Sequence, residues 1–166
     1  MKALFSLVLF LLSGLIFCAD YNFELYNMND KMFSLKKILA EAETRLVVVD
    51  FVSMYCEPCK KAVPDWSALY KEYKAKGLEI VVIILPSAGD RAGEAKLIKA
   101  FFEQHNVKFM YSYDKYSVVG KKFGVVDKNG SAIVPQIFLI DKKMELAFRS
   151  DDHNKVIAKI KEVLSK

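Results

Sequence analysis

The sequence predicts an α/β fold, a three-layer α/β/α sandwich built on a mixed central sheet. Two unbroken apolar runs, Leu46–Val49 and Ile80–Leu85, are rich in β-branched residues, as is typical of strands buried on both faces of a sheet. Apolar residues recur at helical spacing between these runs. Near the C-terminus two shorter runs flank a turn, which predicts an antiparallel hairpin. Parallel strands connected by a helix and followed by a hairpin form a mixed sheet.

The N-terminal half begins with short elements. Residues 23–25 alternate in polarity, and turn residues at 27–31 lead to a second short run at 32–33, which predicts a small N-terminal β-hairpin. A buried strand follows at 46–52. The next helix is amphipathic and is expected to stop at Gly77. Its apolar residues are Ala62, Val63, Trp66, Leu69, Tyr70 and Tyr73.

The C-terminal half adds an inserted strand–helix element at 91–112, in which a helix precedes a short strand at Lys108–Tyr111. Residues 116–123 suggest a further short helix. Gln136–Ile140 and Glu145–Arg149 flank the turn of the C-terminal hairpin. A closing amphipathic helix carries the apolar residues Val156, Ile157, Ile160, Val163 and Leu164.

The composition is that of one folded domain behind a targeting segment. The chain has 166 residues, of which 53% are hydrophobic and 13% aromatic, enough for a core and too apolar for disorder. The net charge of +5 is scattered along the chain, so we expect no nucleic acid partner. Three cysteines are too few for a disulfide-dense scaffold.

Residues 1–19 are expected to be a signal peptide or an N-terminal anchor. One lysine precedes a stretch without charge that ends at Ala19. Three outcomes stay open: lipidation of Cys18, which ends a lipobox-like sequence; cleavage near Ala19; or retention as a membrane anchor. Each places the domain, residues 20–166, in an extracytoplasmic location, in the periplasm or on the outer face of a bacterial membrane. Membrane contact is then expected only through the N-terminus.

The chemistry is expected at Cys56-Glu57-Pro58-Cys59, where a buried strand gives way to a helix. The N-terminus of a helix offers free N–H groups and a positive dipole, which stabilise a thiolate. Cysteines three positions apart on one turn can close a disulfide. Cys56 is therefore predicted to be the exposed nucleophile and Cys59 the deeper, resolving thiol. Pro58 fits the first helical turn, where its missing N–H has no partner to lose.

Two plainer interpretations of the cysteine pair are a structural disulfide and half of a metal site. A structural bridge seldom closes so short a loop, because the stabilisation grows with loop length. A zinc site needs two further ligands, and the two histidines, His105 and His153, have no paired spacing, so no metal is expected. We expect His105 near a helix C-terminus, His153 at a solvated helix start and Trp66 in the core.

Several segments together resemble the thioredoxin superfamily, and most closely its exported TlpA/ResA-type thiol–disulfide oxidoreductases. The resemblance runs from about Phe23 to the C-terminus and implies a thioredoxin-like fold that includes the N-terminal hairpin and the inserted strand–helix element. The segments that carry it are Val49-Asp50-Phe51, Cys56-Glu57-Pro58-Cys59-Lys60-Lys61 with Pro64, and Val134-Pro135 with the apolar strand after it.

The resemblance also implies residue roles. Cys56 attacks a disulfide and Cys59 resolves the mixed disulfide that results. Pro135 is expected to be cis and to place the Val134 backbone beside Cys56, where it binds an extended substrate. Asp50, a buried acid, would have a raised pKa and accept the proton of Cys59. The alternative for Asp50 is a strand-end carboxylate that caps a loop.

The chain departs from the family pattern at three places. Tyr55 stands where a tryptophan is usual, Ala62 stands where ResA-type proteins carry an acid, and residues 126–133 form an extra turn before the proline. This turn would border the substrate groove. The residues expected to contact substrate are Tyr55, Glu57, Pro58, Val134 and Pro135.

The function implied is that of an extracytoplasmic thiol–disulfide oxidoreductase that reduces disulfides in exported proteins, apocytochrome c among them. Its redox group would be the Cys56–Cys59 disulfide, with no other cofactor, and a membrane thiol carrier of the DsbD/CcdA type would supply electrons. Glu57, a negative charge between the thiols, should disfavour the Cys56 thiolate and keep the couple reducing. The alternatives are an oxidase that donates disulfides, a copper- or haem-handling module with two soft thiol ligands, and a thiol peroxidase.

Overall fold

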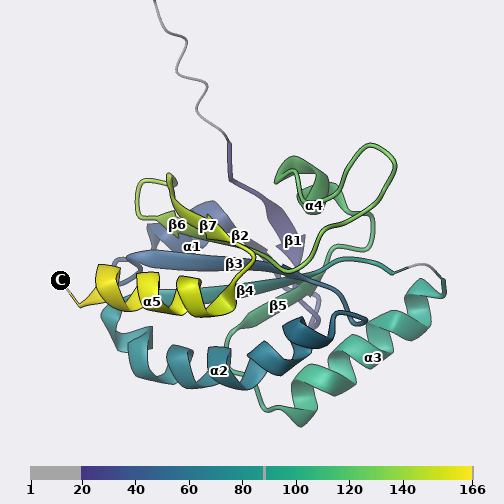
Figure 1. Cartoon of the computed structure of the whole chain (residues 1–166), viewed down its shortest axis with the longest axis horizontal. Helices are drawn as coiled ribbons and strands as arrows, with labels where there is room; N and C mark the ends of the chain where they lie inside the picture. Colours follow the sequence, from purple (N-terminus) through teal and green to yellow (C-terminus); the bar gives the residue numbers. More distant parts are fainter. Residues whose placement is uncertain (1–19, 88, 166) are drawn as a thin grey trace, which may run out of the picture.

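The computed structural model describes residues 20–87 and 89–165. At its centre lies a five-stranded sheet with the strand order β5-β4-β3-β6-β7 (Figure 1). β3 (Leu46–Val52) pairs in parallel with β4 (Leu78–Ile84), and β4 pairs in parallel with β5 (Met110–Tyr113). On the other side of β3, β6 (Gln136–Asp141) and β7 (Leu146–Ser150) add an antiparallel hairpin. The predicted mixed sheet is confirmed.

Helices cover both faces of this sheet, as predicted (Figure 1). α2 (Glu57–Tyr73), α3 (Arg91–Gln104) and α5 (His153–Leu164) pack on one face. α1 (Leu35–Ala40) and α4 (Val118–Lys122) lie on the opposite face. The fold is therefore a three-layer α/β/α sandwich with two separate apolar cores, one on each side of the sheet.

The central strand β3 divides its side chains between the two cores. Val48 and Val52 belong to the core beneath α2, α3 and α5, whereas Val49 and Phe51 belong to the core on the α1 and α4 side. This alternation follows from the two-residue period of a strand. Asp50 has the parity of Val48 and Val52, so its carboxyl group faces α2.

A two-stranded antiparallel hairpin precedes the main sheet, as predicted. It consists of β1 (Glu24–Tyr26) and β2 (Met32–Ser34). The hairpin reaches the outer edge of β5, where Asn27 forms an isolated bridge with Ser112 and the Ser112 hydroxyl donates to the carbonyl of Tyr26 at 2.7 Å. The N-terminal hairpin is thus joined to the sheet by backbone pairing.

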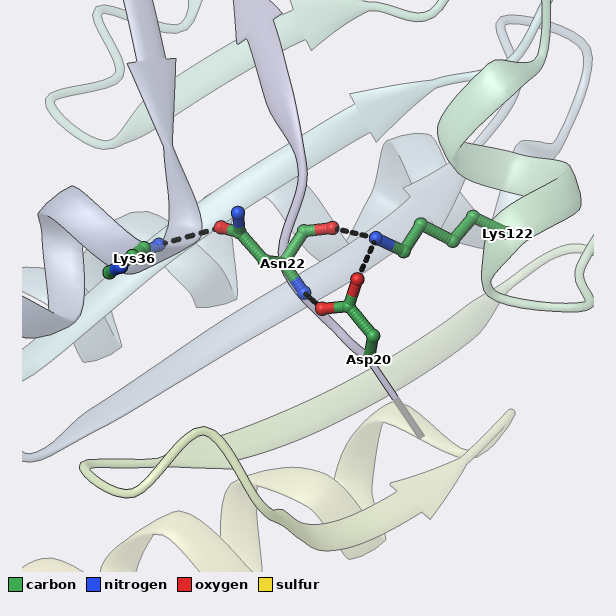
Figure 2. A network of polar contacts seen from close by, with 4 residues as sticks. All are labelled: Asp20, Asn22, Lys36 and Lys122. Atoms are coloured by element: carbon green, nitrogen blue, oxygen red, sulfur yellow. Dashed lines mark hydrogen bonds and ion pairs between the residues drawn. The ribbon is translucent and has the colours of Figure 1, made fainter. Parts of the chain in front are cut away.

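The first described residues are tied to two helices by polar contacts (Figure 2). The Lys122 ammonium, at the end of α4, donates to the Asp20 carboxylate at 2.7 Å and to the Asn22 carbonyl. The Asn22 side chain accepts the backbone N–H of Lys36 in α1 at 3.0 Å. The segment leading into β1 is therefore held between α1 and α4.

The predictions for the targeting segment, residues 1–19 with the lipidation candidate Cys18, lie outside the described residues. Within the part of the chain that is described, no helix combines the length and the apolar character that crossing a membrane requires.

Two elements differ from the sequence predictions. Helix α1 was not predicted, although its signals are present: Ser34 caps it by accepting the N–H of Lys37, and Leu35 and Leu39 are buried. Six residues make only one and a half turns, too few for a clear helical period. The short strand after α3 starts at Met110 rather than at Lys108, because pairing with β4 begins there.

Candidate active site

The two cysteines lie at the first turn of α2, joined by a disulfide with a Cα–Cα distance of 5.2 Å. Cys56 is the N-cap of the helix, and its Sγ accepts the backbone N–H of Cys59 at 3.3 Å. Cys56 is partly exposed, whereas Cys59 is only 5% exposed. The predicted order, an accessible thiol at the helix N-terminus and a deeper one behind it, is the order observed.

The residues around the disulfide are mostly exposed. Glu57 and Pro58 occupy the first positions of α2, and the Glu57 carboxylate pairs with the Lys60 ammonium one turn later. This hydrogen bond, with the charges of Lys60 and Lys61, lowers the pKa of Glu57. Tyr55, directly before Cys56, has 74% of its surface exposed. The entrance to the disulfide therefore offers one aromatic ring and a paired rather than a free negative charge.

Asp50 lies behind the disulfide in the middle of β3 and is only 2% exposed. One carboxylate oxygen accepts the indole N–H of Trp66 at 2.9 Å, and the other oxygen has no hydrogen-bond partner. Burial raises the pKa of Asp50 from 3.8 to about 7, and the Trp66 hydrogen bond acts in the opposite direction. The carboxylate does not cap a loop. It is a buried acid that exchanges its proton near neutral pH.

A narrow cavity connects Asp50 to the deeper cysteine. Its lining includes Asp50, Cys59, Lys60 and Trp66, with Phe101 and other apolar side chains around them. The space measures about 10 Å³, roughly what one water molecule needs. Asp50 and Cys59 therefore line the same small space, which is large enough for about one water molecule.

The Val134–Pro135 peptide bond is cis, as the resemblance implies. Pro135 directly precedes β6, and Gln136 pairs with Phe51 near the end of β3. Because β3 and β6 are antiparallel, the start of β6 and the end of β3 lie at the same edge of the sheet. The cis proline and the Cys56–Cys59 segment thus lie at the same end of the central strands β3 and β6. Val134 packs against both cores.

Residues 126–133 form the extra turn that the sequence suggested. The Asp127 carboxylate accepts the backbone N–H groups of Asn129 and Ser131, each at 2.8 Å, and Val126 bridges Ala132. These internal contacts close the turn, which lies in the chain between α4 and the cis proline. It ends at Ile133, whose side chain is largely exposed.

Two contacts near this site were not predicted from the sequence. Trp66 was correctly placed in the core, but its bond to Asp50 was not foreseen, although a buried indole N–H usually has a hydrogen-bond partner. The prediction of a solvated His153 is wrong: its imidazole packs edge-to-face on Trp66, with ring centroids 4.6 Å apart. The position beside three polar residues suggested solvent, whereas the docking of α5 on α2 buries most of the ring. His105 caps α3, as predicted.

Known proteins resemble this chain in sequence and fold. The AhpC/TSA family model matches residues 19–149. The thiol–disulfide oxidoreductase ResA of Bacillus thuringiensis is 31% identical over 122 residues, which cover 73% of this chain and 61% of the relative. The chain therefore matches less than two thirds of that relative's length.

Solved structures confirm the thioredoxin-like fold. A protein from Chlorobium tepidum, described as a putative thiol:disulfide interchange protein DsbE, superposes with a TM-score of 0.68 at 21% identity, covering 86% of this chain and 93% of its own. A thiol:disulfide interchange protein from Bacteroides gives the same TM-score at 16% identity, with 87% of each chain covered. The match to ResA in turn confirms the resemblance to the ResA-type thiol–disulfide oxidoreductases.

Proposed function

Because the chain belongs to the AhpC/TSA family, we propose that it is a thiol–disulfide oxidoreductase that reduces disulfides in exported proteins. The observation that carries the proposal is the cysteine pair itself: a partly exposed Cys56 at a helix N-terminus, bonded to a buried Cys59 that shares a cavity with a buried acid. A structural disulfide needs neither the helix terminus nor the acid. A dithiol that exchanges electrons uses both.

The reaction begins with both cysteines reduced. The Cys56 thiolate, stabilised by the Cys59 N–H and the dipole of α2, attacks one sulfur of a substrate disulfide. The substrate S–S bond breaks, a bond forms between Cys56 and the substrate, and the second substrate sulfur leaves as a thiolate. Cys56 makes this attack because it is the more accessible of the two thiols.

The second step releases the substrate. Asp50 accepts the proton of Cys59, and the resulting thiolate attacks Cys56, so that the mixed disulfide breaks and the Cys56–Cys59 disulfide forms. The second substrate thiol is released, and two electrons have passed from the protein to the substrate. An acid whose pKa is about 7 suits this transfer, since it is partly ionised at neutral pH.

The extended substrate would lie across the end of β3 and β6, between Cys56 and the cis proline. The Val134 backbone would bind it, and Tyr55, Glu57 and Pro58 would border it. We place the domain outside the cytoplasm on the strength of its N-terminal sequence. Apocytochrome c is the substrate we favour among exported proteins, and a membrane thiol carrier of the DsbD/CcdA type is the electron donor that such a location requires.

The reduction potential of the Cys56/Cys59 couple tests this direction of electron flow. The full chain is equilibrated in dithiol buffers of known potential, and the reduced fraction is read from the mass added by a thiol reagent. We expect a value at or below that of thioredoxin, about −270 mV. A value of about −120 to −180 mV would instead identify a disulfide donor or isomerase. Stoichiometric Cu(I) binding without disulfide reduction would point to a copper-handling module, and rapid peroxide consumption would point to a peroxidase.

Replacing Glu57 by glutamine is expected to raise this potential. The change removes a negative charge beside Cys56 and leaves Lys60 without its ion-pair partner, and both effects favour the thiolate of the reduced form. Because the pair is exposed, the rise should be small beside the roughly 150 mV that separates thioredoxin from a strong oxidant. Measurement at low and high salt should show the rise shrinking with ionic strength. An unchanged or lower potential would contradict this account of Glu57.

A further inference from the structure

The ionisation of Asp50 depends on one hydrogen bond. Among the described residues, Trp66 is its hydrogen-bond partner, and the second carboxylate oxygen is buried without one. The remaining lining of its cavity is mainly apolar and opposes its charge; the charged member, Lys60, is paired with Glu57. Any residue that fixes the direction of the Trp66 N–H therefore influences when Asp50 gives up its proton.

One such residue comes from the opposite end of the sequence. His153 is the first residue of α5, and its ring stands at 89° to the Trp66 ring with the centroids 4.6 Å apart. Trp66 itself is 1% exposed, and on its Asp50 side the indole borders a small cavity rather than close-packed side chains. The imidazole supports the ring from α5.

The chemistry of His153 is unusual for a packing residue. Its Nε2 atom is buried and has no hydrogen-bond partner, and its Nδ1 atom lies 3.9 Å from an Asp65 carboxylate oxygen, beyond hydrogen-bond distance. An unpaired buried polar atom destabilises the folded state. A flat ring at this position is therefore retained at the expense of stability, which indicates a role beyond filling space.

We propose that His153 is a positioning residue, whose imidazole holds the Trp66 indole in the orientation in which its N–H donates to Asp50. The inference rests on the proposed function, because Asp50 accepts a proton only if Cys59 resolves a mixed disulfide. His153 touches neither a thiol nor the carboxylate and acts through the indole alone.

The charged groups around the imidazole do not replace this packing role. Asp65 faces it from α2 and Asp152 faces it from the start of α5, and both raise the pKa of His153. Burial is the larger influence and lowers that pKa below 6.5. Burial thus favours the neutral form of the ring, and its edge-to-face contact is what acts on the indole.

The fluorescence of Trp66, the only tryptophan of the chain, provides the test. The oxidised full-length protein is titrated from pH 4 to pH 9, and the step absent from an Asp50→Asn variant is assigned to Asp50. In His153→Ala the indole loses its support and its hydrogen bond weakens, so the midpoint of this step should rise by about half a pH unit or more. His153→Phe restores a flat ring and should return the midpoint close to the native value.

Controls separate this role from a general loss of structure. His105→Ala removes the other histidine, on α3, and should leave the Asp50 step unchanged. If His153→Ala does not fold, His153→Leu, which fills the space without a flat ring, should raise the midpoint in its place. A midpoint that is unchanged or lower in these variants would overturn the proposal, as would failure of His153→Phe to restore it.

The titration needs no substrate, so the two proposals fail separately. A rise in the midpoint in a protein without oxidoreductase activity would refute the proposed function and leave the positioning role standing. In an active protein, the pH profile of mixed-disulfide resolution should move by the same amount as the fluorescence midpoint. A merely structural role would lower the melting temperature and move neither.

Discussion

Replacing Cys59 by serine should trap the protein on its substrates as stable mixed disulfides. In this variant the accessible Cys56 can still attack, but no second thiol is present to break the intermediate. When the full chain is expressed and cells are quenched with acid and alkylated, a ladder of disulfide-linked species should appear on non-reducing gels and vanish on reduction. Mass spectrometry of these species would identify the substrates directly.

The matched control is Cys56→Ser, which keeps the same number of thiols. Its remaining site thiol, Cys59, is buried beneath the first turn of α2, so few mixed disulfides should form. Disulfide reduction by this variant should fall to the background of free thiols. The opposite pattern, with complexes in Cys56→Ser rather than in Cys59→Ser, would reverse the assignment of attacking and resolving thiols.

Asp50→Asn should raise the free energy of unfolding and, at the same time, slow the resolution of the mixed disulfide. The stability gain arises because the native carboxylate pays a burial penalty that asparagine does not, while the asparagine oxygen can still accept the Trp66 N–H. With a folded-state pKa of about 7 against 3.8, the gain in unfolding free energy at pH 8 should be about 2–4 kcal/mol. Urea unfolding of the two oxidised proteins measures it.

The raised pKa of Asp50 determines the direction in which folding stability changes with pH. Between about pH 4 and pH 7 the folded protein binds one more proton than the unfolded chain does, because the pKa of Asp50 is raised by folding. The native protein therefore loses stability as the pH rises through this window and becomes level above it. In Asp50→Asn the part of this decline that Asp50 causes is absent, so the two stability curves should converge near pH 4 and separate by pH 8.

The rate of mixed-disulfide resolution should fall in Asp50→Asn, although the stability of the protein rises. Loss of the proton acceptor should slow resolution of the mixed disulfide by about 10²-fold at pH 7.5. In the native protein the resolution rate should increase with pH up to about 7, as Asp50 ionises, and this inflection should be missing in the variant. Stopped-flow measurement on Cys56 linked to a small thiol would show both effects.

Asp114→Asn is the control for removing a buried acid. Asp114 is as buried as Asp50, but it accepts the N–H groups of Val118 and Gly120 at the start of α4 and does not line the cavity at Cys59. Its replacement should leave the resolution rate unchanged. Equal slowing in both variants would mean that buried charge in general, rather than Asp50, controls the step.

The sequence predicted those parts of the fold that local patterns determine. The run at Leu46–Val49 can be buried on both faces only in a central strand, and the spacing of Cys56 and Cys59 at a strand–helix junction determines which thiol is accessible. The cis bond at Pro135 followed from the family resemblance. In each case the informative residues are close together in the sequence or belong to a motif.

The contacts that were not predicted depend on how helices dock. The period of β3 allows Asp50 to face α2, but only the packed structure shows which side chain of α2 meets it. Trp66 could have been proposed, since a buried indole N–H and a buried carboxylate satisfy one another. His153 could not, because its neighbours in the sequence are polar and its burial results from α5 crossing over Trp66.

The N-terminal hairpin has a consequence for one edge of the central sheet. An open sheet edge offers unpaired backbone groups to any extended polypeptide, and this is a common route to aggregation. At β5 that edge is covered at Ser112, which bridges Asn27 and donates its hydroxyl to the carbonyl of Tyr26 in the molecule's own hairpin. Under the proposed function, a peptide substrate bound at Cys56 would find the Ser112 position of β5 already paired, which disfavours its addition to the sheet as an extra strand there.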